Sequence, residues 1–157
     1  MKIKFAEVSD APLIHDLMIK AFTEYKDEVP PSSALEETIQ LISTALKDDE
    51  RALIGYVDGD AVGMVRFRLN ENGVYFYRLS VIPEKQGQGM AKKIIKSLED
   101  YAIQNGKTAI RCKVRMTVPK NIELYSSIGY SIYDEEVVVK PNGVNIKVVS
   151  MKKQLTI

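Results

Sequence analysis

Residues 74–92 place a strand, a short loop with two glycines and a helix in direct succession, and this segment constrains the fold most strongly. Residues 74–82 are rich in aromatic and β-branched side chains, which predicts a strand. Gly87 and Gly89 interrupt the pattern, and from Met90 onwards the apolar residues repeat at helical spacing. The chain therefore combines strands with helices.

Similar patterns extend along the rest of the chain. Strands are predicted at residues 2–8, 53–57, 61–68, 74–82, 109–116, 130–139 and 144–151. Helices are predicted after Ser9 or Asp10, behind the capping-box sequence Ser33-Ala34-Leu35-Glu36, from Met90 to the stop at Asn105-Gly106, and at residues 120–128. The chain has 157 residues, and about one domain is expected per 150 residues, so residues 1–157 are predicted to form a single α+β domain.

Composition argues against several classes of protein. The chain has 22 Lys and Arg against 21 Asp and Glu, and a net charge of +1 gives no electrostatic reason to expect nucleic acid binding. Its apolar runs are far shorter than the roughly 20 residues of a membrane-spanning helix, and its first residues do not resemble a signal peptide. One cysteine, Cys112, and one histidine, His15, exclude an internal disulfide and a zinc site. We expect a cytoplasmic protein without a metal and without a membrane partner.

The glycine loop suits a phosphate ligand. The first N–H groups of a helix lack intrahelical acceptors and carry partial positive charge. Gly87 and Gly89 let the backbone approach a ligand closely, and Lys92 adds a positive charge, so we expect a pyrophosphate here. A dinucleotide-binding fingerprint is excluded because Lys92 occupies the position of its last glycine, and no Walker A sequence is present. A glycine turn without a ligand is the alternative.

The segment Gln86-Gly87-Gln88-Gly89-Met90-Ala91 resembles the Gln/Arg-x-x-Gly-x-Gly/Ala acyl-CoA loop of the GNAT superfamily of N-acyltransferases. The resemblance covers nearly the whole chain, since the predicted order of strands and helices also fits the family. Residues 78–84 are similar to the central strand of the family, and residues 121–130 to its second motif. It implies a single-domain α+β fold with a mixed, mostly antiparallel sheet of about six to seven strands, splayed at the central parallel pair and flanked by about four helices. It also implies acetyl-CoA as the cosubstrate.

The resemblance further implies how the cosubstrate is bound. The backbone of Leu79, Ser80 and Val81 would bind the pantetheine arm as an added strand would, in the gap beside residues 109–116. An N–H near Leu79 would face the thioester carbonyl and stabilise the negative charge that develops on its oxygen as the amine attacks. The pyrophosphate would lie on Gln86, Gly87, Gln88, Gly89, Met90, Ala91 and Lys92.

Asn121 and Tyr125 are four residues apart, so they share one face of a predicted helix. By resemblance, Asn121 would bind the pantetheine arm and Tyr125 would place its hydroxyl by the thioester sulfur. A thiol has a pKa of about 8.5 and a tyrosine one of about 10, so hydrogen-bond donation rather than complete proton transfer would assist the leaving group. The alternative for Tyr125 is a core aromatic beside Leu124 and Ile128.

The acceptor amine must lose a proton, because an alkylamine has a pKa of about 10. Some family members use a glutamate on the central strand, but residues 75–80 contain no carboxylate. The proton could instead pass to a chain of waters or to one of four acidic residues of the first helices: Glu24, Asp27, Glu28 and Glu36. We assign the role of base to none of them.

Other residues keep more than one interpretation. Tyr75 and Tyr77 would line the acceptor pocket or pack against a helix, Cys112 is predicted in the core, and His15 is predicted at the surface. Three cationic residues share one strand face and would favour an acidic acceptor, meet cofactor phosphates or simply face solvent: Arg111, Lys113 and Arg115. The solvated face is the favoured interpretation.

We therefore expect an N-acetyltransferase that moves an acetyl group from acetyl-CoA to a primary amine of a small molecule or peptide, by direct attack in a ternary complex. The alternative is a catalytically inactive CoA-binding sensor or regulatory module. A structural interaction protein would bind no CoA. The edges of the last hairpin would allow a second subunit to pair, which would give a homodimer.

Overall fold

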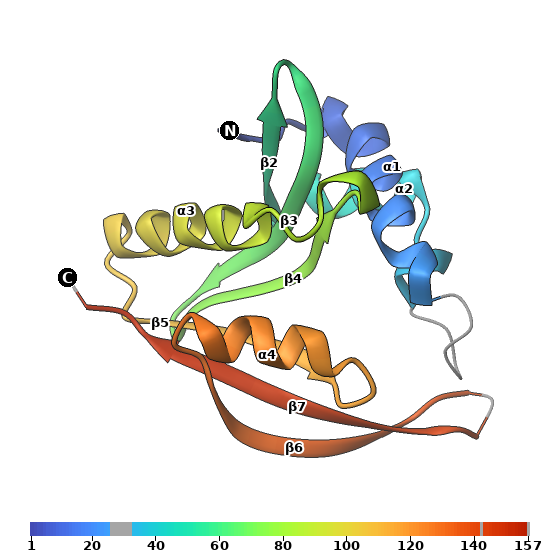
Figure 1. Ribbon diagram of the computed structural model, residues 1–157, viewed down its shortest axis with the longest axis vertical. Helices are drawn as coiled ribbons and strands as arrows, with labels where there is room; N and C mark the ends of the chain where they lie inside the picture. The colour runs from blue at the N-terminus through green and yellow to red at the C-terminus, as the bar shows by residue number, and fades with distance from the viewer. Residues whose placement is uncertain (26–32, 142, 157) are drawn as a thin grey trace.

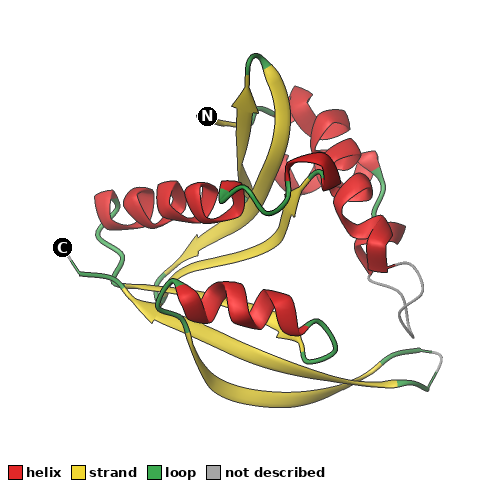
Figure 2. Ribbon diagram, in the orientation of Figure 1, coloured by secondary structure: helices red, strands yellow, loops and turns green. Residues whose placement is uncertain are grey.

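The computed structural model describes residues 1–25, 33–141 and 143–156. One seven-stranded sheet has the strand order β1-β2-β3-β4-β5-β7-β6 (Figures 1 and 2). The strands are β1 (Lys2–Phe5), β2 (Arg51–Val57), β3 (Asp60–Asn70), β4 (Gly73–Val81), β5 (Ala109–Arg115), β6 (Ser131–Val139) and β7 (Asn145–Gln154). The helices are α1 (Ala11–Phe22), α2 (Ile39–Lys47), α3 (Met90–Gln104) and α4 (Pro119–Ser127). The predicted α+β class is confirmed.

Neighbouring strands run antiparallel throughout the sheet except at its centre, where β4 and β5 are parallel. Antiparallel hairpins link consecutive strands: β2 and β3 are joined at Asp58-Gly59, and β6 pairs with β7. The sheet therefore has two antiparallel halves, β1 to β4 and β5-β7-β6, which meet at a single parallel contact.

Alternation along the strands divides the core into two layers. Leu53, Val65 and Phe67 point to one side, into a buried cluster that includes residues of α3 and α4. Ile54 and Met64 point to the other side, where α1 and α2 cover them. In Figure 1, α3 crosses the upper half of the sheet and α4 lies along β5 and β7.

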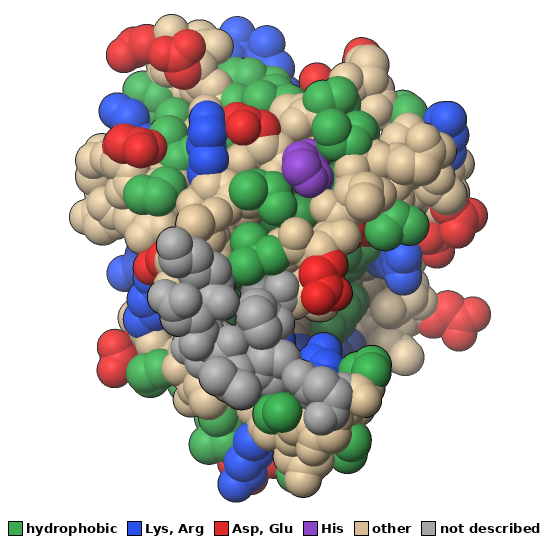
Figure 3. All heavy atoms as spheres, turned by 90° about the vertical axis from the view of Figure 1, so that its right-hand side faces the viewer, with side chains coloured by type: hydrophobic (Ala, Val, Ile, Leu, Met, Phe, Trp, Pro, Cys, Tyr) green, Lys and Arg blue, Asp and Glu red, His purple; other side chains and the backbone are tan. Residues whose placement is uncertain are grey.

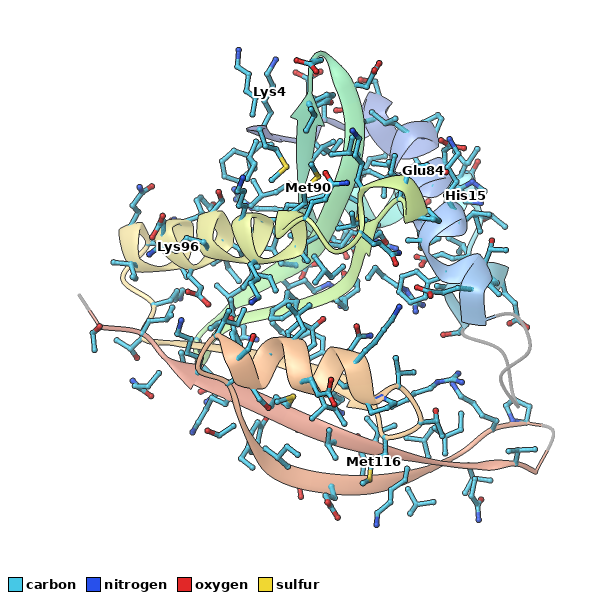
Figure 4. All side chains as sticks on the ribbon, in the orientation of Figure 1. Lys4, His15, Glu84, Met90, Lys96 and Met116 are labelled. Carbon is cyan, nitrogen blue, oxygen red and sulfur yellow. The ribbon has the colours of Figure 1, made fainter. Side chains whose placement is uncertain are left out.

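Helix α3 shows how the apolar pattern becomes packing. Ile94, Ile95 and Leu98 recur on one face of the helix and are all fully buried. Each such side chain contributes about 1.5–3 kcal/mol when it leaves water. This burial holds the amino-terminal end of α3, at Met90, against the centre of the sheet (Figure 4).

Two predicted boundaries are wrong. The first strand ends at Phe5 rather than residue 8, because the N–H of Glu7 donates to the Asp10 carboxylate (2.8 Å) and the chain turns into α1. Residues Ser33–Glu36 form one short 3-10 turn instead of opening a helix. Helix α2 begins only at Ile39, where Thr38 is extended and its hydroxyl caps the helix.

The face of the molecule in Figure 3 carries both acidic and basic side chains. His15 lies on α1 and is partly rather than fully exposed (Figure 4). Within the described ranges, no helix is long and apolar enough to cross a membrane.

Candidate functional site

The parallel strands β4 and β5 separate soon after they meet. Along these two strands, which the structure describes in full, only two positions pair: Val74 with Ile110 and Tyr75 with Arg111. Beyond Tyr75 the strands diverge, and Figure 1 shows β4 rising away from β5 towards α1. The predicted splay of the central parallel pair is confirmed, and it opens the sheet at its centre.

A β-bulge turns β4 at the splay. Val65 on β3 faces two residues of β4, Arg78 and Leu79, because the register shifts between Met64 and Arg66. Arg78 has a positive φ of 56°, a conformation that costs a non-glycine residue about 1–3 kcal/mol and that clusters at functional sites. The bulge therefore bends β4 at the point where it leaves β5.

The glycine loop connects the end of β4 to the start of α3. Gly87 and Gly89 have φ angles of 78° and 80°, which glycine adopts without strain. A Cβ built at either position would meet no atom within 4 Å, so open space lies over the loop backbone. The side-chain amide of Gln86 donates to the carbonyl of Val81 (3.0 Å), which ties the loop back to the strand.

A cavity of about 450 Å³, the loop cavity, lies beside this loop. Its wall contains nine of the predicted cofactor-binding residues: Leu79, Val81, Gln86, Gly87, Gly89, Met90, Ala91, Lys92 and Asn121. Two predicted residues do not line it. The Ser80 side chain is buried and donates to the carbonyl of Arg78 (2.9 Å), and the Gln88 side chain turns back to the carbonyl of Glu84 (3.4 Å).

A second cavity of about 650 Å³, the sheet cavity, occupies the splay itself. Tyr75 and Tyr77 line it, as one of their two predicted interpretations has it. Three residues line both cavities, namely Phe22, Leu79 and Asn121, so the two spaces adjoin. Two molecules bound in these cavities would therefore meet at the bulge of β4.

Tyr125 lies one helical turn after Asn121 on α4, at this junction. It is both a core aromatic and a cavity residue, because it is 6% exposed and still lines the sheet cavity. Its ring packs edge-on against Phe76 at 5.5 Å and in a tilted arrangement against Tyr130 at 5.9 Å. The two interpretations of Tyr125 are thus compatible, since the packing fixes where the ring can point.

A buried cluster of charges forms one wall of the sheet cavity. The guanidinium of Arg66, on β3, donates to both carboxylate oxygens of Glu37 (2.7 and 2.7 Å) and to both of Glu50 (2.7 and 3.1 Å). Arg78 adds a longer contact to Glu37 (3.3 Å), and the Tyr77 hydroxyl donates to Glu50. Arg66 is 2% exposed, so water cannot replace these partners.

The cluster perturbs the two carboxylates in opposite directions. Burial would raise the pKa of Glu37, but the hydrogen bonds and charges of Arg66 and Arg78 outweigh it and hold the pKa below its usual value. Burial dominates at Glu50 and raises its pKa despite Arg66. No local sequence pattern predicts this cluster, since Arg66 lies 16 and 29 residues from Glu50 and Glu37. An arginine inside the otherwise apolar run of residues 61–67 was the available signal, because a buried charge requires a partner.

The candidate bases from the sequence lie elsewhere. Glu24 lines the loop cavity and is paired with Lys120 (2.9 Å), while Glu36 lines neither cavity. Asp27 and Glu28 fall outside the described residues. Within the described chain, no group of three His, Cys, Asp or Glu residues is arranged to hold a metal ion.

The favoured interpretation of the cationic face of β5, a solvated one, holds for Lys113, whose side chain is 48% exposed, but part of the face also borders a cavity. Lys113 and Arg115 line the sheet cavity, and Lys113 also pairs with Glu136 (2.8 Å). Arg111 instead donates to the carbonyl of Asn72 (2.6 Å) and does not line the cavity.

Cys112 is buried in the core, as predicted, and burial raises its pKa to about 12.

Comparison with known proteins identifies the family to which this fold belongs. The model of the Acetyltransferase (GNAT) family matches residues 12–130, which span β4, the glycine loop and α4. The chain belongs to the GNAT acetyltransferase family. Members of this family generally use acetyl-CoA, and the open glycine loop beside a cavity fits such a cosubstrate.

Solved structures agree on the GNAT fold. The ribosomal-protein-S18-alanine N-acetyltransferase from Escherichia coli is similar with a TM-score of 0.80 at 15% identity, covering 99% of this chain and 94% of that one. A variant of spermidine N-acetyltransferase from Vibrio cholerae gives a TM-score of 0.74 at 21% identity, covering 98% and 95%. A GNAT acetyltransferase from Streptococcus pneumoniae gives 0.77 at 16% identity, covering 98% and 99%. At such identities the likeness extends to the fold and not to the acceptor.

Proposed function

We propose that this chain is an N-acetyltransferase that moves an acetyl group from acetyl-CoA to a primary amine of a small molecule or peptide, by direct attack in a ternary complex. The observation that carries the proposal is the meeting of two cavities at Leu79 and Asn121, one beside the open glycine loop and one beside Tyr125. Residues 1–157 would act as one catalytic domain.

The loop cavity would bind the cosubstrate. The first hydrogen bond of α3 runs from the N–H of Lys93 to the carbonyl of Gly89 (3.2 Å), so the preceding N–H groups of the helix have no intrahelical acceptor. We propose that the pyrophosphate lies on these amides, with Lys92 adding a charge-assisted contact. The remaining proposed contacts come from the loop, the bulged strand and α4: Gln86, Gly87, Gln88, Gly89, Met90, Ala91, Leu79, Ser80, Val81 and Asn121.

Bound acetyl-CoA supplies the acetyl group as a thioester. The N–H of Leu79, at the bulge, would donate to the carbonyl oxygen as negative charge develops there. Tyr125 would donate its hydroxyl hydrogen bond to the departing sulfur, which lowers the barrier without complete proton transfer. Its packing against Phe76 and Tyr130 supports this role, because a donor held in one orientation needs little reorganisation.

The acceptor amine would lose its proton to water. Both described carboxylates of the sheet cavity, Glu37 and Glu50, already accept hydrogen bonds from Arg66. The pKa of Glu37 is held below its usual value, which makes it a weak base. Burial raises the pKa of Glu50, but its oxygens already accept hydrogen bonds from Arg66 and the Tyr77 hydroxyl. We therefore expect the reaction rate to rise with pH until the acceptor amine itself is deprotonated.

Replacing Tyr125 with Phe tests the proposal, because the change removes only the hydroxyl from a packed ring. We expect kcat for CoA release in the presence of an amine panel to fall about a hundredfold, within the range for a general acid, while the affinity for acetyl-CoA is unchanged. Tyr101→Phe is the matched control, since the Tyr101 hydroxyl bonds Arg51 (2.9 Å) and lines neither cavity. A wild-type protein that binds acetyl-CoA but acetylates no amine would instead be a sensor, and one that binds no CoA would be neither.

We also propose a homodimer and a cytoplasmic location. The outer strand β6 exposes Ile132, Tyr133, Val137 and Val139, and an exposed apolar edge strand invites pairing with another chain. Light scattering should then give a dimer mass that Val137→Lys reduces to that of a monomer. A monomer at all concentrations would contradict the dimer.

The proposed cytoplasmic location follows from the need for acetyl-CoA and is tested by cell fractionation.

A further inference from the structure

We propose that the acceptor amine carries a carboxylate group, which Arg68 and Lys113 bind in the sheet cavity. This inference rests on the proposed function and narrows its substrate to small amines of the amino-acid type.

The wall of the sheet cavity is cationic. Among its described residues, only Glu37 and Glu50 are acidic. Five described residues of the same wall are cationic: Arg66, Arg68, Arg78, Lys113 and Arg115. The chain as a whole has a net charge of only +1, so this excess is local to the cavity.

The two acidic residues are not available to a cationic substrate. Glu37 and Glu50 each receive two hydrogen bonds from the guanidinium of Arg66 at 2.7–3.1 Å. Arg78 also contacts Glu37 at 3.3 Å, and the Tyr77 hydroxyl donates a hydrogen bond to the Glu50 carboxylate. Two arginines thus neutralise two carboxylates, and a polyamine would find no free acid on this wall.

Two of the remaining cations, Arg68 and Lys113, are held by exposed ion pairs. Arg68, on β3, pairs with Asp49 at 3.5 Å, and Lys113, on β5, pairs with Glu136 at 2.8 Å. All four side chains of these pairs are between 42% and 68% exposed, and neither Asp49 nor Glu136 lines the cavity. Exposed pairs of this kind are weak, so a substrate carboxylate inside the cavity can replace the acidic partner.

These cations flank an aromatic surface between the two halves of the splayed sheet. The guanidinium of Arg68 lies 5.9 Å from the ring centre of Tyr77, which in turn lies 5.8 Å from that of Tyr75. Lys113 lines the same cavity from β5, in the other half of the splayed sheet. A cavity of about 650 Å³ fits a small molecule, with an apolar body on the tyrosines and its carboxylate on these cations.

The test compares amines that differ only in the carboxylate: tyrosine with tyramine, and lysine with cadaverine, with spermidine as a polycation. We expect kcat/KM to favour the carboxylate member of each pair by at least about tenfold, because a hydrogen bond to a charged group contributes this much. Arg68→Gln and Lys113→Gln should each reduce that preference several-fold. Arg111→Gln is the matched control, since Arg111 lies on the same face of β5 but outside the cavity wall.

The outcomes separate this inference from the proposed function. Preference for tyramine, cadaverine or spermidine, or a carboxylate preference that both variants retain, would overturn the inference while leaving the N-acetyltransferase intact. If no amine is acetylated, the proposed function fails, and calorimetric affinities of the same pairs for the CoA-loaded protein decide the inference. Equal affinities within each pair would then overturn it, and tighter binding of the carboxylate members would support it.

Discussion

Replacement of Arg66 by Met tests whether the buried charge cluster holds the wall of the sheet cavity together. Arg66 is 2% exposed and makes four hydrogen bonds of 2.7–3.1 Å to Glu37 and Glu50. Met retains the unbranched apolar stem but leaves two carboxylates without their main partner. Breaking a buried ion pair from one side costs about 3–5 kcal/mol. We expect a loss of about 3 kcal/mol, at the lower end of that range, because Arg78 still contacts Glu37.

Urea unfolding followed by circular dichroism at neutral pH measures this loss. Adding Glu50→Gln to the Arg66→Met variant should recover part of the stability, because it removes one of the two stranded charges. Lys96→Met, on the exposed pair with Asp100 (3.0 Å), is the control and should leave the unfolding midpoint unchanged. A loss below about 1 kcal/mol for Arg66→Met would refute the reasoning, since that is an ordinary value for any substitution.

Two further predictions concern titration and reactivity. The pKa of Glu37 lies below its usual 4.5, so the stability that it contributes is present above that value and is lost as the pH falls through the lower, folded-state pKa. Glu37→Gln should therefore unfold more easily at neutral pH and show a flatter dependence of urea midpoint on pH below about pH 5, and an unchanged acid profile would contradict this. Cys112 is 2% exposed with a pKa raised to about 12, so a thiol reagent near pH 8 should label it only as fast as the protein unfolds. Rapid labelling of the native protein would show that the thiol is accessible.

Local patterns in the sequence were sufficient to predict most of the fold. The strands around Asp58-Gly59 and the start of α3 at Met90 were predicted within a few residues, because turn chemistry and apolar spacing act over neighbouring positions. The residues of the glycine loop were found for the same reason, since the loop is continuous in sequence. Helix α2 begins later than its capping box indicated, because Thr38 caps it instead.

What the sequence did not reveal depends on contacts between distant residues. Arg66 reaches Glu50 and Glu37 across 16 and 29 residues, and no local pattern links these positions. Whether Lys113 faces solvent or a cavity depends on how far β5 diverges from β4, which alternation along one strand does not encode. The charged wall of the sheet cavity therefore had to come from the structure, whereas the glycine loop is continuous in sequence and did not.

Calorimetric titration with acetyl-CoA tests the central claim most directly, because the claim begins with the glycine loop. The protein is compared with Gly89→Glu and with the control Gly106→Glu. Both glycines have a positive φ, 80° and 73°, and open space around a Cβ, so the strain of the substitution is matched. We predict saturable binding by the wild-type protein and by Gly106→Glu, and at least about tenfold weaker binding by Gly89→Glu, whose carboxylate would repel the pyrophosphate. Equal affinity for all three, or no binding by the folded wild-type protein, would contradict the account.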